Sequence, residues 1–158
     1  MVSATVSSNE AATYAHPGIR FNYQDEKNFN MVYLRLFKWH MNSIGGTSVQ
    51  YASMINGVIS YQSSNAAKSL SKALTNRVLT IEFQVDKRII SVDGSVVLTV
   101  TGNFQDDVPM VGIYVNLKPG DRVVIDSFNI LQRSILVSTP TEFMRSEISG
   151  ITATPVSL

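Results

Sequence analysis

Apolar and polar residues alternate along several stretches of this chain, and such alternation is typical of half-buried β-strands. The pattern first appears over 19–23, ahead of a polar turn at 25–28, and it is most regular after Asn76. Asp93-Gly94 lies between two such stretches and is a favoured two-residue hairpin turn, which predicts a β-hairpin over 89–101. The strands predicted after Asn76 are 79–85, 89–92, 96–101, 111–117 and 123–128.

The segment Met31–Met41 is apolar on both faces of a predicted strand. Val32, Leu34 and Leu36 share one face, and Tyr33 is on the other face with further large side chains. A strand with two apolar faces is covered on both sides, so we expect it in the centre of a sheet. The segment has no Gly or Pro, so a helix is the alternative.

The period changes between Gly46 and Asn76. Apolar residues recur there with i, i+3, i+4, i+7 spacing, which predicts one amphipathic helix over 51–59. Ser64 or Asn65 is a suitable N-cap for a second helix that ends near Leu74. The residues of the first stripe are Tyr51, Met54, Ile55, Val58 and Ile59.

These elements predict an α+β fold, in which a helix pair packs on one side of an antiparallel β-sheet with meander connections. Residues 1–17 are mostly small and polar, so we expect a flexible N-terminal arm that serves self-association. Residues 18–158 are then a single α+β domain. The predicted core of the meander consists of Leu79, Ile81, Phe83, Leu98, Val100, Val111, Ile113 and Ile125.

Charged residues are distributed unevenly along the chain, and this distribution predicts a binding surface. Charged residues make up only 16% of the chain, and no acidic residue lies between Lys27 and Ile81. We therefore predict a face for an anionic partner, either RNA or an anionic membrane surface, built from Lys38, Lys68, Lys72 and Arg77. The alternatives are a contact with the acidic half of another subunit, or a solvated helix face.

Candidate catalytic chemistry is sparse. The chain has no Cys, and its two histidines, His16 and His40, have no metal-ligand spacing. Nucleophile and phosphate-loop motifs are also missing. We therefore expect no enzyme activity, no catalytic residue, no metal, no cofactor and no small-molecule substrate.

The segment Val92–Thr101, followed by an acidic loop and Pro109-Met110, resembles a strand and loop of the rhabdovirus matrix proteins. The matching residues are Gly94, Leu98, Thr99, Pro109 and Met110. The expected order of elements (arm, long strand, helix pair, meander) is also similar to that family, and a compact plant-virus type is the nearest fit.

This resemblance implies a non-enzymatic viral structural protein that self-assembles as a homo-oligomer and links nucleocapsid to envelope. It further implies contact with viral nucleoprotein or RNA, and a location in the virion and in the host cytoplasm or nucleus. Two alternatives are a capsid or decoration protein of a non-enveloped virus or phage, and a small β-rich, lectin-like binding module.

Overall fold

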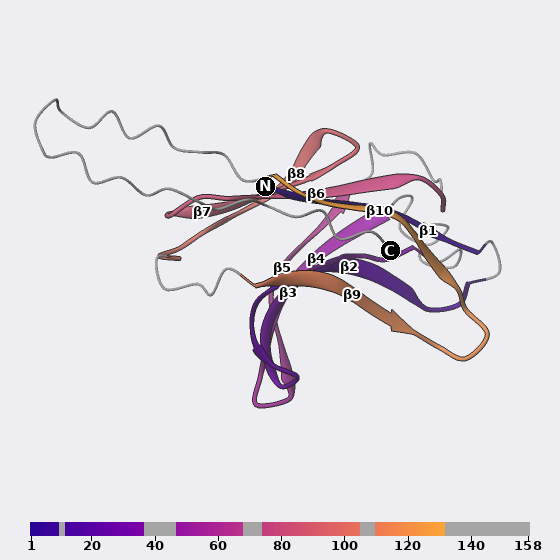
Figure 1. Cartoon of the computed structure of the whole chain (residues 1–158), viewed down its shortest axis with the longest axis horizontal. Helices are drawn as coiled ribbons and strands as arrows, with labels where there is room; N and C mark the ends of the chain where they lie inside the picture. The colour runs from indigo at the N-terminus through magenta and orange to yellow at the C-terminus, as the bar shows by residue number, and fades with distance from the viewer. Residues whose placement is uncertain (10–11, 37–46, 68–73, 105–109, 132–158) are drawn as a thin grey trace, which may run out of the picture.

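The chain folds into two antiparallel β-sheets packed face to face (Figure 1). The computed structural model describes residues 1–9, 12–36, 47–67, 74–104 and 110–131. Sheet A has the strand order β10-β1-β6-β7-β8, and sheet B has the order β5-β4-β3-β2-β9. The strands are β1 (Val2–Ser8), β2 (Ala15–Asp25), β3 (Asn28–Leu34), β4 (Thr47–Ile55), β5 (Val58–Ala67), β6 (Arg77–Phe83), β7 (Lys87–Val92), β8 (Ser95–Thr101), β9 (Val111–Leu117) and β10 (Val123–Ile130).

The strands predicted from period-two alternation are confirmed as strands. The hairpin of β7 and β8 turns at Asp93 and Gly94, whose φ angles of 50° and 80° are those of the expected turn. β3 is a central strand, as its two apolar faces predict, because it pairs with β2 on one side and β4 on the other. Residues 37–41 of that predicted strand lie outside the described residues.

The α+β prediction is wrong, because the described residues form strands and contain no helix. The first predicted helix is instead the hairpin of β4 and β5, which turns at Asn56 and Gly57 with φ angles of 52° and 80°. Asn-Gly is a favoured turn between strands, and its signal outweighs the helical spacing of the neighbouring apolar residues.

The exposure of the residues in the predicted helical stripe also contradicts a helix. Tyr51 is 1% exposed, whereas Ile55 and Val58 are 54% and 69% exposed, so these residues do not share a buried face. The N-cap proposed for the second helix lies within β5, and residues 68–73 lie outside the described residues.

The flexible arm is also a wrong prediction for Val2–Ser8. These residues form β1, which pairs with β10 on one side and with β6 on the other. Val2, Ala4 and Val6 are buried and alternate with Ser and Thr, so the segment has the period of a strand despite its polar composition. A strand between two neighbours satisfies its backbone hydrogen bonds and stabilises the sheet.

The connection after β9 separates two consecutive strands, which would pair with each other in the predicted meander. β9 pairs with β2 in sheet B, and β10 pairs with β1 in sheet A. The turn at 118–121 therefore crosses between the sheets, and each of these strands forms an edge.

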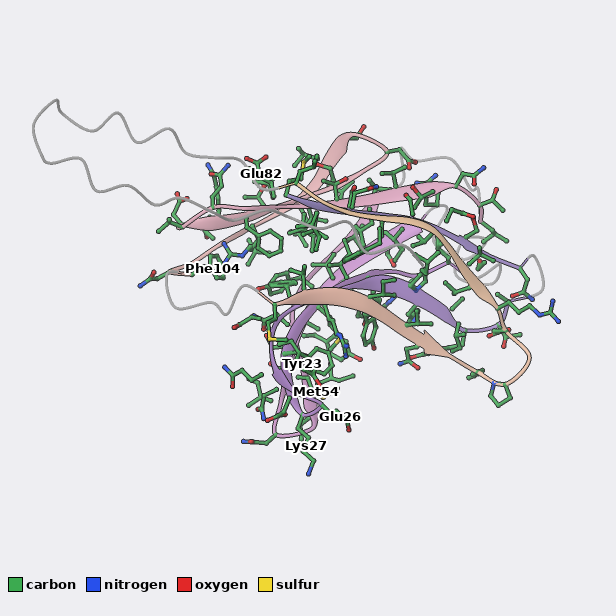
Figure 2. All side chains as sticks on the ribbon, viewed as in Figure 1. Tyr23, Glu26, Lys27, Met54, Glu82 and Phe104 are labelled. Carbon is green, nitrogen blue, oxygen red and sulfur yellow. The ribbon has the colours of Figure 1, made fainter. Side chains whose placement is uncertain are left out.

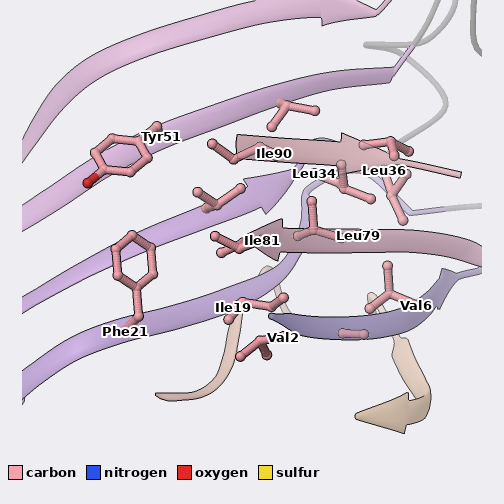
Figure 3. Packing of buried hydrophobic residues seen from close by; sticks show 14 residues of the cluster. Val2, Val6, Ile19, Phe21, Leu34, Leu36, Tyr51, Leu79, Ile81 and Ile90 are labelled. Carbon is pink, nitrogen blue, oxygen red and sulfur yellow. The ribbon is translucent and has the colours of Figure 1, made fainter. Parts of the chain in front are cut away.

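The core lies between the two sheets, and both contribute to it (Figure 3). Leu79 and Ile81 are fully buried there, as predicted, whereas Ile113 is 39% exposed at the β9 edge and does not belong to the buried set. The remaining predicted core residues pack partly buried against the cluster: Phe83, Leu98, Val100, Val111 and Ile125.

Candidate functional site

The outer face of sheet B, which points away from sheet A, carries a group of aromatic and polar side chains. Its register is regular, since Tyr114 of β9 lies opposite Gly18 of β2, and Gly18 lies opposite Tyr33 of β3. Tyr33 in turn lies opposite Gln50 of β4. Strand residues that are directly opposite share a face, so this row crosses four strands on one side of the sheet. We call the following set the tyrosine face: Tyr14, His16, Gly18, Arg20, Tyr33, Arg35, Gln50, Tyr61, Tyr114 and Asn116.

Gly18 allows the two central tyrosines of this face to meet. Because Gly18 has no side chain, the rings of Tyr33 and Tyr114 approach across it, with 5.5 Å between their centroids. A Cβ atom on Gly18 would lie 2.6 Å from the Cβ of Tyr33 and would also overlap the carbonyl oxygen of Val32. Any larger residue at position 18 therefore pushes β3 away from β2.

The aromatic contacts continue along the face from this centre. His16 stacks on Tyr33, with 4.9 Å between the ring centroids and 24° between the planes. Tyr14 also packs against His16, with 4.1 Å between the ring centroids. Phe29 lies 6.4 Å from Tyr114. The result is a continuous row of aromatic contacts across the face.

Polar groups lie beside the aromatic row. Arg35 donates from Nη2 to Oε1 of Gln50 over 3.3 Å. Asn116 of β9 lies opposite His16 of β2. Amide and guanidinium groups are planar, and their adjacent donors and acceptors can hold two neighbouring hydroxyl groups of one ligand.

The tyrosine hydroxyls belong to the same network. Burial raises the pKa of Tyr33 from 10.0 to about 12, neighbouring Tyr61 adds to the rise, and a hydrogen bond with Arg35 opposes it. Burial also raises the pKa of Tyr114, while a hydrogen bond with Asn116 acts in the opposite direction. These hydroxyls are therefore protonated at neutral pH and can both donate and accept.

Burial divides the tyrosine face into a floor and a rim. Tyr33, His16 and Gln50 are only 3–5% exposed and form the floor. Tyr61 is 62% exposed, and Tyr114 is partly exposed, so both can touch a ligand. The rim also includes Arg20, Arg35 and Asn116, which are partly exposed.

One end of the face reaches towards the turn between β2 and β3. Figure 2 shows Tyr23 and Met54 near that end, with Glu26 and Lys27 at the turn itself. The guanidinium carbon of Arg20 lies 4.5 Å from the centre of the Tyr23 ring. A Cβ on Gly112 would lie 3.0 Å from Nε of Arg20, so the arginine side chain extends across that glycine towards β9.

The predicted anionic-partner face is not this surface. Arg77 is 1% exposed at the start of β6, and its Nη1 lies 3.2 Å from Oδ2 of Asp93. It therefore has a structural role beside the β7–β8 turn and does not point to solvent. Lys38, Lys68 and Lys72 lie outside the described residues.

The described part of the chain contains neither a metal-binding group of side chains nor a membrane-spanning helix. Its His, Asp and Glu side chains form no group of three or more that could hold a metal ion. His16 packs among tyrosines instead. None of the described segments is a helix long and apolar enough to cross a membrane.

Sequence reasoning missed the tyrosine face because it depends on a distant strand pair. The local signal exists, since His16, Gly18 and Arg20 alternate with apolar residues, as do Gly112, Tyr114 and Asn116. The two strands are far apart in the sequence, however, and their pairing brings the two sets together. The alternation within each segment predicts a strand, but it does not predict that these two strands pair with each other.

Comparisons with known proteins address the fold. No family model matches the sequence, and no curated protein matches it. A solved structure of the carbohydrate-binding module CBM66 from Bacillus subtilis is similar, with a TM-score of 0.53 and 15% identity over 80% of this chain and 67% of the module. An ancestral congerin, Con-anc, has a TM-score of 0.49 and 14% identity over 78% of this chain and 86% of its own.

The likeness to the CBM66 module agrees with the two-sheet architecture and establishes the fold class as a β-sandwich. Neither of these proteins is a viral matrix protein. The matrix-protein resemblance depended partly on a helix pair, and the described residues contain no helix. The resemblance itself stays a prediction.

Proposed function

We propose that this chain is a non-enzymatic, lectin-like binding module, and that its tyrosine face binds a carbohydrate. The single observation that carries the proposal is the Tyr33–Tyr114 pair across Gly18, with Arg35, Gln50 and Asn116 beside it. The likeness to a carbohydrate-binding module supports the choice, although a fold by itself does not specify a ligand.

The chemistry of the face suits a sugar. A sugar ring has an apolar C–H surface and a rim of hydroxyls, each of which donates and accepts. The electron-rich face of a tyrosine ring attracts the C–H groups, whose hydrogens are weakly positive. Planar amide and guanidinium groups can then hold neighbouring hydroxyls in pairs. Binding sites commonly combine an apolar surface with a few convergent polar groups in this way.

The experiment is a screen of the purified chain on an array of neutral and acidic oligosaccharides, followed by calorimetry with the saccharide that binds best. Tyr114→Ala removes a ring that is partly exposed on the face, and we expect affinity to fall at least tenfold. Tyr114→Phe keeps the ring and removes the hydroxyl, so we expect a smaller loss. Thr99→Ala, at an exposed position on β8 of the other sheet, is the control and should bind as wild type does.

The proposal fails if no saccharide on the array is bound, or if Tyr114→Ala binds as tightly as wild type. Circular dichroism of each variant separates loss of binding from loss of folding.

A second candidate, self-association, is favoured by a different observation. We propose that the edge formed by β9 and β10 contacts a second copy of the chain, in line with the predicted homo-oligomer. Val115, Leu117 and Ile130 are 42%, 37% and 59% exposed along this edge, and each strand is the last of its sheet. Edge strands present free backbone groups and readily add another strand.

Light scattering during size-exclusion chromatography tests this candidate. Val115→Asp should shift the protein towards a monomer, while Thr99→Asp should not. A wild-type protein that is monomeric at high concentration contradicts self-association and leaves carbohydrate binding untouched.

A further inference from the structure

The tyrosine face contains arginines but no carboxylates. Its outward positions on β2, β3, β4 and β9, and those described on β5, hold no Asp or Glu. Arg20 is one of these positions and Arg35 directly follows β3, and no carboxylate of the described residues lies within ion-pair distance of either guanidinium. Charges of one sign on a weakly hydrated aromatic surface create a potential that favours a ligand of opposite charge.

Among the described residues, Glu26 lies at the β2–β3 turn (Figure 2), and two other acidic residues at the margins of the face have partners of their own. Asp121 accepts hydrogen bonds from the backbone nitrogens of Thr13 and Tyr14 over 2.9 and 2.6 Å. Asp25 accepts from the backbone nitrogen of Lys27 over 2.7 Å, within the β2–β3 turn. These carboxylates are committed to their turns and do not neutralise the arginines.

Arg20 is held so that its hydrogen-bonding edge is available. Its guanidinium carbon lies 4.5 Å from the Tyr23 ring centre, so the cation interacts with the ring. Such an arrangement leaves the N–H groups at the periphery free for a planar acceptor, and a carboxylate can accept two parallel bonds from one guanidinium. The missing side chain at Gly112 gives the arginine the room to lie there.

Arg35 holds its position through the floor of the site. Arg35 makes hydrogen bonds to Gln50, over 3.3 Å, and to the hydroxyl of Tyr33. A guanidinium has five N–H donors, so others of them can bind a ligand. Arg20 lies opposite Met31 on β3, four positions from Arg35. At about 3.3 Å per residue the Cα atoms of the two arginines are roughly 13 Å apart in the strand direction. Their side chains also diverge, since Arg20 extends to Gly112 of β9 and Arg35 to Gln50 of β4. One carboxylate cannot reach both, whereas an oligosaccharide with several charges can.

We propose that the tyrosine face selects acidic oligosaccharides, with one carboxylate of the ligand on Arg20 and another near Arg35. This inference rests on the proposed carbohydrate binding and specifies its ligand class. The sugar rings of the ligand would stack on Tyr61, which is exposed, and on Tyr114, which is partly exposed.

The test uses oligosaccharides whose charge can be removed without changing the sugar. Oligogalacturonates, oligoglucuronates and oligomannuronates are each compared with their methyl esters by calorimetry on the full chain. We expect at least one acid to bind ten times more tightly than its ester, and we expect the difference to shrink at high salt because the charges are then screened.

Arg20→Gln removes the charge at one end of the face. It should lower the ratio of acid to ester affinity at least about threefold, by a larger factor than it changes ester affinity, because one of the two carboxylate contacts is lost while Arg35 remains. Arg20→Lys keeps the charge but loses the planar fork, so it should lie between the two. Lys87→Gln, on β7 of the other sheet, is the control for net charge and should keep the wild-type ratio.

Three results overturn the inference. Equal wild-type affinity for acids and esters shows that charge is not selected, while carbohydrate binding itself stands. An unchanged ratio in Arg20→Gln shows that the selection does not come from this arginine. Failure of every acidic and neutral saccharide to bind overturns both this inference and the proposed function.

Discussion

Replacement of Gly18 by alanine tests whether the tyrosine face depends on the close approach of β2 and β3. The new Cβ would lie 2.6 Å from Cβ of Tyr33 and 2.7 Å from its Cα. Non-bonded carbon atoms prefer a separation of about 3.5–4.0 Å, so the overlap is about 1 Å. Both of the overlapped atoms are fixed to the backbone of β3, so no rotation of a side chain can relieve it.

The expected cost follows from this geometry. Overpacking of this kind costs about 1–3 kcal/mol. A separation of the strands by about 1 Å also lengthens the neighbouring ladder hydrogen bonds beyond their normal range, at about 1 kcal/mol for each one lost. Alanine lowers the entropy of the unfolded chain and returns about 0.4–1 kcal/mol. We therefore expect Gly18→Ala to lower the free energy of unfolding by about 2 kcal/mol or more.

Gly112→Ala is the matched control, because Gly112 lies on the same face of the neighbouring strand. There the new Cβ would lie 3.0 Å from Nε of Arg20, which belongs to a long side chain that can move. The gain from the unfolded chain then offsets most of the cost, and we expect a change within about 0.5 kcal/mol.

Urea unfolding, followed by circular dichroism, measures both variants. With a slope of about 2 kcal/mol/M, Gly18→Ala should lower the midpoint by about 1 M or more. Saccharide binding, measured on the folded variant, should weaken as the two tyrosine rings separate. Equal midpoints for Gly18→Ala and Gly112→Ala would refute the reasoning, because they would show that β3 does not pack against position 18 as described.

Three further predictions concern stability. Ile81→Ala should cost about 2–5 kcal/mol in urea unfolding, since Ile81 is fully buried, whereas Ile113→Ala should cost less than about 1 kcal/mol at its half-exposed edge; equal costs would contradict this account of the core. Asp93→Asn should keep the turn and the hydrogen bond from the Val78 nitrogen but remove the negative charge facing Arg77. We expect the free energy of unfolding to fall by about 1–2 kcal/mol, a moderate amount because Asp93 is itself 37% exposed. An unchanged urea midpoint would mean that the ion pair adds nothing to stability. The raised pKa of Tyr33 means that its neutral form is favoured in the fold, so its contribution to stability is complete below pH 10.0 and is lost as the pH rises towards about 12. Tyr33→Phe should weaken this alkaline loss, as measured by the unfolding midpoint between pH 9 and 12, and an identical pH profile would exclude Tyr33 as its source.

Part of the candidate site could be predicted from the sequence. The strand that carries Tyr33, with large side chains on both faces, was predicted to be central, and the structure places it between β2 and β4. The scarcity of acidic residues between Lys27 and Ile81 was also visible. The residues assigned to the anionic face were different, however, because exposure of a charged residue depends on the tertiary fold. Arg77 is buried against the turn that Asp93 begins, and no local pattern distinguishes it from an exposed arginine.

The sequence by itself determined those elements whose causes are local. Alternation of apolar and polar residues specified the strands β6 to β10, and Asp93-Gly94 specified the turn between β7 and β8, because a positive φ at two successive positions strongly favours these residues. Tertiary structure decided what depends on distant partners. Val2–Ser8 is a strand because β6 and β10 provide hydrogen bonds on both of its sides. The helical spacing after Gly46 did not produce a helix, since the Asn56-Gly57 turn and the pairing with β3 favour strands. Likewise, Tyr33 and Tyr114 form one face only because β9 joins sheet B beside β2, and a pairing between segments so far apart leaves no periodic trace in the chain.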